Sequence, residues 1–123
     1  MDPNRLTGKN ILITGAAQGM GAAIGEHYAA QGANVCLGDV NVEGVKAVAG
    51  RINAARINGG NNSGKAIAVK LDVTSRADNA AAVEATSEAF GSLNVALLNA
   101  GINKPKFFMD IDEENWDTIM NVN

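Results

Sequence analysis

A glycine-rich stretch near the start of the chain, ILITGAAQGMG (11–21), has the residue types and spacing to bind an anion. A tight turn between a strand and a helix directs free backbone N–H groups and the positive end of the helix dipole at one point. We expect Gly15 to turn the chain sharply, Gly19 to leave room for a phosphate, and Gly21 to let the helix pack close to the sheet. The stretch therefore predicts a phosphate-binding loop, with a plain structural turn as the alternative.

The spacing of these glycines narrows the class of phosphate ligand. The pattern G-x-x-x-G-x-G differs from the G-x-G-x-x-G of the widespread dinucleotide-binding turn. It also lacks the G-K-[ST] ending of the loop that binds nucleoside triphosphates. A nucleoside triphosphate is therefore disfavoured as the ligand.

Asp39 follows the second apolar run and lies 18 residues beyond Gly21. A carboxylate at this position can accept hydrogen bonds from both hydroxyls of an adenosine ribose. The 2′-phosphate of NADP would meet its negative charge, and neither Gln18 nor Val40 is a base that could offset the repulsion. We therefore predict that NAD is preferred over NADP. The alternative is an aspartate that only closes the turn after a strand.

The elements that must position these residues alternate between strand-like and helix-like segments. Strands are expected at 10–14, 34–38, 66–71 and 94–98. Helices are expected at 19–31, at 42–57, from a cap at Ser75 to Phe90, and again after a cap at Asp112. In the third helix, Asp78 is expected to reach back to the capping residue. The order predicts an α/β fold in one domain (1–123), a Rossmann-like three-layer α/β/α arrangement with a parallel sheet.

Composition argues against several other classes of function. A net charge of −3 leaves no basic stripe for a nucleic-acid backbone or an anionic membrane, so neither partner is expected. No stretch approaches the roughly 20 apolar residues of a membrane span. A single cysteine, Cys36, rules out an internal disulfide and a zinc site built from several cysteines, and it suits a reducing, cytoplasmic setting.

Three further stretches combine with the glycine loop to give a family resemblance: LDVT (71–74), LNAGI (98–102) and NWDTIMNVN (115–123). With Thr14 and the glycines in the pattern T-G-x-x-x-G-x-G, they closely resemble the short-chain dehydrogenase/reductase family over nearly the whole chain. The resemblance implies a Rossmann-like fold that is truncated after the fourth strand and the start of the following helix.

The resemblance also implies roles for individual residues. Asp72 and Val73 would contact the adenine ring, while Asn99, Ala100 and Gly101 would line the cofactor groove, Asn99 also holding the central strands together. The alternative for each is packing at a strand end. The full set expected to bind the cofactor is Thr14, Gly15, Gln18, Gly19, Met20, Gly21, Asp39, Val40, Asp72, Val73, Asn99, Ala100 and Gly101.

Asn123 matches the asparagine that, in this family, completes a catalytic tetrad with a serine, a tyrosine and a lysine. The only tyrosine, Tyr28, is followed four residues later by Gly32, so the family's Y-x-x-x-K cannot form. We therefore interpret the chain as the NAD-binding portion of an enzyme that interconverts alcohols and ketones, and expect the chain alone to be inactive. A stand-alone, non-catalytic dinucleotide-binding module and an inert, self-associating remnant stay open as alternatives.

The resemblance implies the strand order 3-2-1-4-5-6-7, which would leave the fourth strand of this chain at an edge. An exposed apolar edge is a template for pairing with another chain. We therefore expect a homo-oligomer formed through the fourth strand or by exchange of the last helix.

Overall fold

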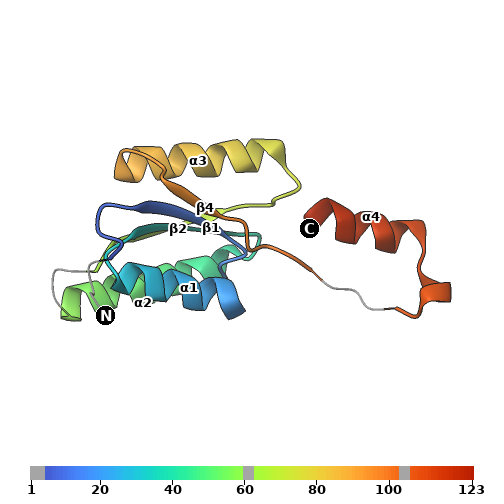
Figure 1. Ribbon diagram of the computed structural model, residues 1–123, viewed down its shortest axis with the longest axis horizontal. Coiled ribbons are helices and arrows are strands. Elements are labelled where there is room, and N and C mark those ends of the chain that lie inside the picture. Colours follow the sequence, from blue (N-terminus) through green and yellow to red (C-terminus); the bar gives the residue numbers. More distant parts are fainter. Residues whose placement is uncertain (1–4, 60–62, 103–105) are drawn as a thin grey trace.

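The computed structural model describes residues 5–59 (backbone only for 57–59), 63–102 and 106–123 (Figure 1). Its elements, in chain order, are β1 (Asn10–Thr14), α1 (Gly19–Ala30), β2 (Asn34–Asp39), α2 (Val42–Gly59), β3 (Ala66–Lys70), α3 (Arg76–Phe90), β4 (Val95–Leu97), the 3₁₀ helix η1 (Phe108–Asp110) and α4 (Glu113–Val122). The predicted strands and helices are confirmed. Strand β4 is shorter than expected, and η1 was not predicted.

The four strands form one parallel sheet in the order β3-β2-β1-β4. Helices α1 and α2 cover one face of this sheet and α3 covers the other, as Figure 1 shows. The three-layer α/β/α architecture is therefore confirmed. Strand β4 lies at an edge, since among the described residues it pairs with β1 alone.

The core lies on both faces of the central strands, which explains why β1 and β2 are almost continuously apolar. Ile11, Ile13, Val35 and Leu37 pack with α1 and α2. On the other face, Leu12 and Cys36 pack against α3, where burial raises the pKa of the Cys36 thiol. Each β1 residue is thus buried whichever face it points to.

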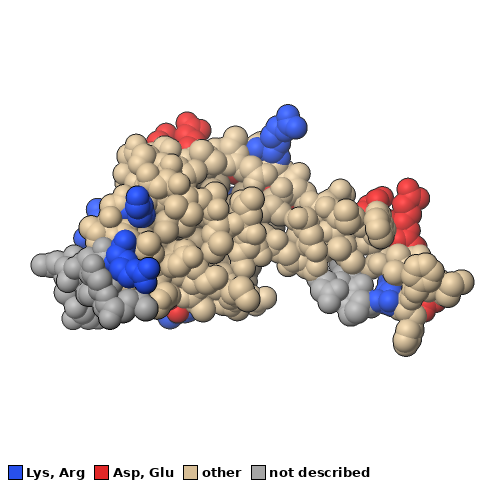
Figure 2. Space-filling view, in the orientation of Figure 1, with Lys and Arg blue, Asp and Glu red and all other residues tan. Residues whose placement is uncertain are grey.

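Helix α4 and η1 form an arm that lies beside the three layers (Figure 1). Phe107, Phe108 and Met109 at its outer end are 83%, 85% and 87% exposed. Figure 2 shows acidic side chains gathered near the same outer end, where α4 begins with Glu113 and Glu114. Among the described residues, no helix combines the length and hydropathy needed to cross a membrane.

Three asparagines tie the amino ends of the strands together. The buried Asn10 side chain donates to the Phe90 carbonyl oxygen at 3.3 Å and to Ser92 Oγ at 3.1 Å. Its Oδ1 accepts a hydrogen bond from Asn34 Nδ2 at 3.0 Å, and its backbone N–H donates to Asn94 Oδ1 at 2.8 Å. Neutral amides therefore satisfy the polar groups at this end of the sheet.

We predict that Asn10→Ala lowers the free energy of unfolding by about 1–3 kcal/mol, because it leaves buried partners without hydrogen bonds. Denaturant unfolding at neutral pH measures this change. Asn79→Ala is the matched control, since Asn79 also donates to backbone carbonyls but is exposed, so water can replace it. Equal losses for the two variants would contradict a structural role for the asparagine cluster.

Candidate functional site

A cleft of about 440 Å³ opens at the carboxyl ends of the strands, the edge where parallel α/β sheets bind ligands. It is lined by Gly15, Gln18, Gly19, Asp39, Val40, Leu71, Asp72, Val73, Asn99, Ala100, Gly101, Ile102 and Val122. The lining includes every residue predicted to bind the cofactor except Thr14, Met20 and Gly21. Leu71, Ile102 and Val122 were not predicted individually, although each lies within or beside a motif that suggested the family.

The glycines of the loop differ in what they leave room for. Gly15 has a φ of +67°, and a Cβ there would lie 2.8 Å from Ala100 Cα. A Cβ on Gly21 would collide with the Gly15 carbonyl oxygen and lie 2.7 Å from Asn99 Nδ2. A Cβ on Gly19 would meet no atom within 4 Å, although its φ is +58°. Gly15 and Gly21 therefore permit close packing, whereas Gly19 leaves space at the cleft.

Helix α1 begins at Gly19 and presents its amino end to this loop. Its N-cap, Gln18, makes no side-chain capping bond, and its first turn carries no acidic residue. The N–H groups of a first helical turn have no partner within the helix, and they carry the positive end of the dipole. This end of the cleft therefore suits an anion.

Thr14 and Asn99 join the ends of β1 and β4 behind the cleft. Asn99 Nδ2 donates to the carbonyl oxygens of Thr14 and Gly15, at 3.2 Å in each case. The Ala100 N–H donates to Thr14 Oγ1 at 3.0 Å. Thr14 therefore supports the floor of the cleft without lining it.

Asp39 lies at the end of β2, with its carboxylate between two backbone N–H groups. Oδ2 accepts from Ala17 N at 3.0 Å, and Oδ1 accepts from Asn41 N at 2.9 Å. A carboxylate oxygen can accept two hydrogen bonds, so each oxygen keeps one acceptor position. The carboxylate can therefore hold its own chain and a ligand hydroxyl together.

Asp72 lies in the turn after β3. Its Oδ1 accepts from the Thr74 hydroxyl at 2.6 Å and from Thr74 N at 2.9 Å, which lowers the pKa of Asp72.

Asp78 does not reach back to the Ser75 backbone as expected. Ser75 N already donates to the Asp72 carbonyl oxygen, so Asp78 Oδ2 instead accepts from Asp72 N at 3.0 Å. This hydrogen bond lowers the pKa of Asp78. Ser75 does cap α3, as predicted, by accepting from Asp78 N.

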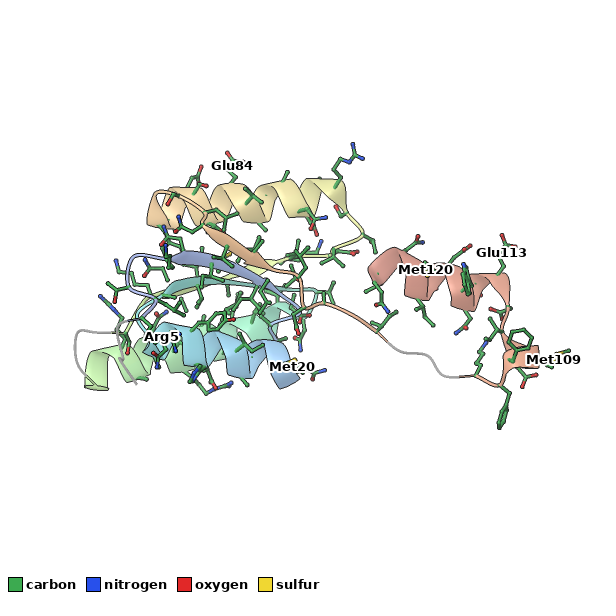
Figure 3. All side chains as sticks on the ribbon, in the orientation of Figure 1. Arg5, Met20, Glu84, Met109, Glu113 and Met120 are labelled. Carbon is green, nitrogen blue, oxygen red and sulfur yellow. The ribbon has the colours of Figure 1, made fainter. Side chains whose placement is uncertain are left out.

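The structure places Met20 outside the cleft. Its side chain is 71% exposed, and Figure 3 shows it at the amino end of α1. Its backbone N–H belongs to the first turn of this helix, so the predicted role rests on the backbone.

Asn123, at the end of α4, pairs with the backbone that follows β4. Its Oδ1 accepts from Ile102 N at 2.8 Å, and its Nδ2 donates to the Ile102 carbonyl oxygen at 3.0 Å. These bonds place Asn123 beside Gly101 at the rim of the cleft. No serine, tyrosine or lysine is among the described residues that line the cleft.

Comparisons with known proteins give a consistent picture. A family model for short chain dehydrogenases matches residues 9–123. A 2,5-dichloro-2,5-cyclohexadiene-1,4-diol dehydrogenase from Sphingobium indicum is 42% identical over 120 residues, which cover 98% of this chain and 45% of the relative. The chain spans less than half the length of this relative and of other curated relatives that it matches.

Two solved structures extend the likeness to three dimensions. A short chain dehydrogenase from Mycobacterium smegmatis gives a TM-score of 0.87 at 29% identity, covering 97% of this chain and 48% of the other. A 3-ketoacyl-(acyl-carrier-protein) reductase from Brucella melitensis, complexed with NADH, gives a TM-score of 0.81 at 37% identity, with coverages of 94% and 44%.

We predict that Gly21→Ala lowers the free energy of unfolding by at least about 2 kcal/mol, because the new methyl group collides with backbone. Gly50→Ala is the control. Gly50 is an exposed glycine of α2 where a Cβ meets nothing within 4 Å, so that variant should gain up to about 1 kcal/mol from helix propensity. Chemical denaturation measures both, and a Gly21→Ala protein as stable as the parent would contradict this packing.

Proposed function

The chain belongs to the short-chain dehydrogenase family, and from this premise we propose that it binds a nicotinamide adenine dinucleotide in the cleft at the carboxyl ends of β1, β2 and β4. One observation carries the proposal: Gly19, where an added Cβ would meet no atom within 4 Å, and Asp39 line the same cleft. The Brucella melitensis relative, which is complexed with NADH, supports the choice of ligand.

The described residues fit the parts of such a ligand. The diphosphate would lie against the first turn of α1 and the loop at Gly19, where N–H groups meet an anion. Asp39 would accept the ribose hydroxyls, Asp72 and Val73 would contact the adenine, and the backbone from Asn99 onward would line the groove toward the nicotinamide. When bound, the nicotinamide supplies a hydride acceptor or donor.

The charges around the cleft support NAD in preference to NADP. The Asp39 carboxylate would repel a 2′-phosphate on the ribose it holds. Among the described residues, the lining contains no lysine or arginine that could pair with that phosphate.

We propose that the chain binds the cofactor without turning it over. Oxidation of an alcohol by hydride transfer needs a group that takes the hydroxyl proton, and such assistance contributes about 10²- to 10⁴-fold to the rate. Among the described residues, the cleft lining offers no serine, tyrosine or lysine for this task. Asn123 lies at the rim, but its side chain is hydrogen-bonded to Ile102. For the enzyme that contains this portion, we propose interconversion of a secondary alcohol and a ketone, with Asn123 as part of the proton relay.

We also propose that two chains associate through the free edge of β4. Val95 is 44% exposed and Leu98 is 80% exposed along or beside this strand, while Trp116 and Met120 on α4 are each 60% exposed. An unpaired edge with apolar neighbours favours addition of a strand. A second copy would extend the sheet about a two-fold axis.

Calorimetric titration with NAD, and with NADP as the comparison, tests the binding proposal. We expect saturable binding that prefers NAD, and no NADH formed when a secondary alcohol is added. Gly19→Ala should weaken NAD binding about tenfold or more, because its methyl group takes the space for the phosphate and breaks hydrogen bonds to a charged group. Gly50→Ala should bind like the parent. A folded chain that binds neither dinucleotide would favour the inert remnant, and turnover would disprove the lack of catalysis.

Light scattering over a range of protein concentrations tests association. We expect a dimer, and we expect Leu98→Lys to shift it toward the monomer, since a charge at the end of an edge strand opposes pairing. Val83→Lys on α3, a site with 43% exposure away from β4, should leave the dimer intact. A monodisperse parent monomer at high concentration would disprove the proposal.

A further inference from the structure

Asp39 connects two segments that are distant in sequence. Ala17, whose N–H donates to Oδ2, lies in the glycine-rich loop, 22 residues before Asp39. Asn41, whose N–H donates to Oδ1, lies in the turn that leads into α2. The carboxylate therefore bridges the loop after β1 and the turn after β2.

Two further contacts dock the loop at the same place. The Ala16 N–H donates to the Gly38 carbonyl oxygen at 3.1 Å, which continues the pairing of β1 and β2 beyond Thr14. A Cβ on Gly44, in the first turn of α2, would lie 2.7 Å from Asn41 Nδ2 and 2.8 Å from Ala17 Cβ, so both side chains lie close to this glycine. Ala17 thus lies close to both Asp39 and Gly44. Its N–H donates to a carboxylate, a stronger type of acceptor than the carbonyl oxygen that accepts from Ala16 N.

We propose that Asp39 is a positioning residue for the glycine-rich loop, in addition to the ribose-binding role on which this inference rests. By holding the Ala17 N–H, the carboxylate fixes the backbone between Gly15 and Gly19 in the form that receives a diphosphate. The ribose and diphosphate sites of the cofactor are therefore coupled through one side chain. A substitution of Asp39 that removes the carboxylate so that NADP can bind therefore also loosens the glycine-rich loop.

Anchoring and charge predict opposite effects on the diphosphate. A carboxylate near the diphosphate repels it, so its removal would strengthen diphosphate binding if Asp39 acted there through charge alone. If Asp39 anchors the loop, its removal weakens diphosphate binding. Adenosine, which has the ribose and lacks the diphosphate, separates the two contributions when its affinity is compared with that of NAD.

Amide hydrogen exchange of the protein without nucleotide tests the anchor directly. We expect the Ala17 amide of Asp39→Ala to exchange about tenfold faster or more than in the parent, as a hydrogen bond to a carboxylate is lost. The amide of Leu37, buried in β2, should not change and reports that the fold is intact. Asp117→Ala, which removes an exposed carboxylate from α4, is the matched control. Unchanged exchange at Ala17 in Asp39→Ala would overturn the proposal.

Should Asp39→Ala fail to fold, Asp39→Asn decides the same question. Its side chain has the same shape but offers one acceptor oxygen to two N–H donors. We then expect faster exchange at Ala17 or at Asn41. Parent-like exchange at both amides would overturn the proposal.

Binding to the variants tests whether the anchor matters for the cofactor. We expect Asp39→Ala to lose more affinity for NAD than for adenosine. Gly44→Ala keeps the carboxylate and crowds both Ala17 and the Asn41 side chain, so it should weaken NAD more than adenosine. Gly50→Ala in the same helix should change neither affinity. Equal losses of affinity for NAD and for adenosine in Asp39→Ala would mean that Asp39 binds the ribose and does not position the loop. If the parent binds neither molecule, the proposed function fails, whereas exchange at Ala17 still decides the positioning role.

Discussion

One side-chain amide satisfies both backbone carbonyls at the carboxyl end of β1, and the site is built around that contact. Asn99 Nδ2 reaches the Thr14 and Gly15 oxygens, so the segments after β1 and β4 must lie close together. This closeness leaves no room for a Cβ on Gly15 or Gly21. The turn, the start of α1 and the floor of the cleft therefore depend on one part-buried pair of hydrogen bonds.

At both ends of the sheet, side chains form hydrogen bonds with backbone groups beyond the strands, but the side chains differ in chemistry. At the amino ends, asparagine amides bind backbone and each other, and they close the sheet with neutral groups. At the carboxyl ends, the carboxylates of Asp39 and Asp72 accept hydrogen bonds from backbone N–H groups beside a cleft. Carboxylate oxygens therefore lie where a polar ligand can contact them.

The sequence was sufficient to predict the element order, the layers and the place of the glycine loop, because these depend on local periodicity and on the backbone freedom of glycine. It also placed Asp39 at a strand end. The partners of the carboxylates could not be read from spacing. Asp78 binds Asp72 N because Ser75 N is already taken, and Asp39 binds Ala17 N because the parallel crossover brings the two turns together. Such pairings depend on tertiary geometry.

The Asn123 amide joins the end of α4 to the backbone of Ile102, in the segment that follows β4. Its two hydrogen bonds are exposed, so each contributes about 0.5–1.5 kcal/mol at most to keeping the arm in place. Among the described residues, Val122 is the part of the arm that lines the cleft. Val122 directly precedes Asn123, so the two bonds to Ile102 also hold this part of the cleft wall beside the segment that follows β4.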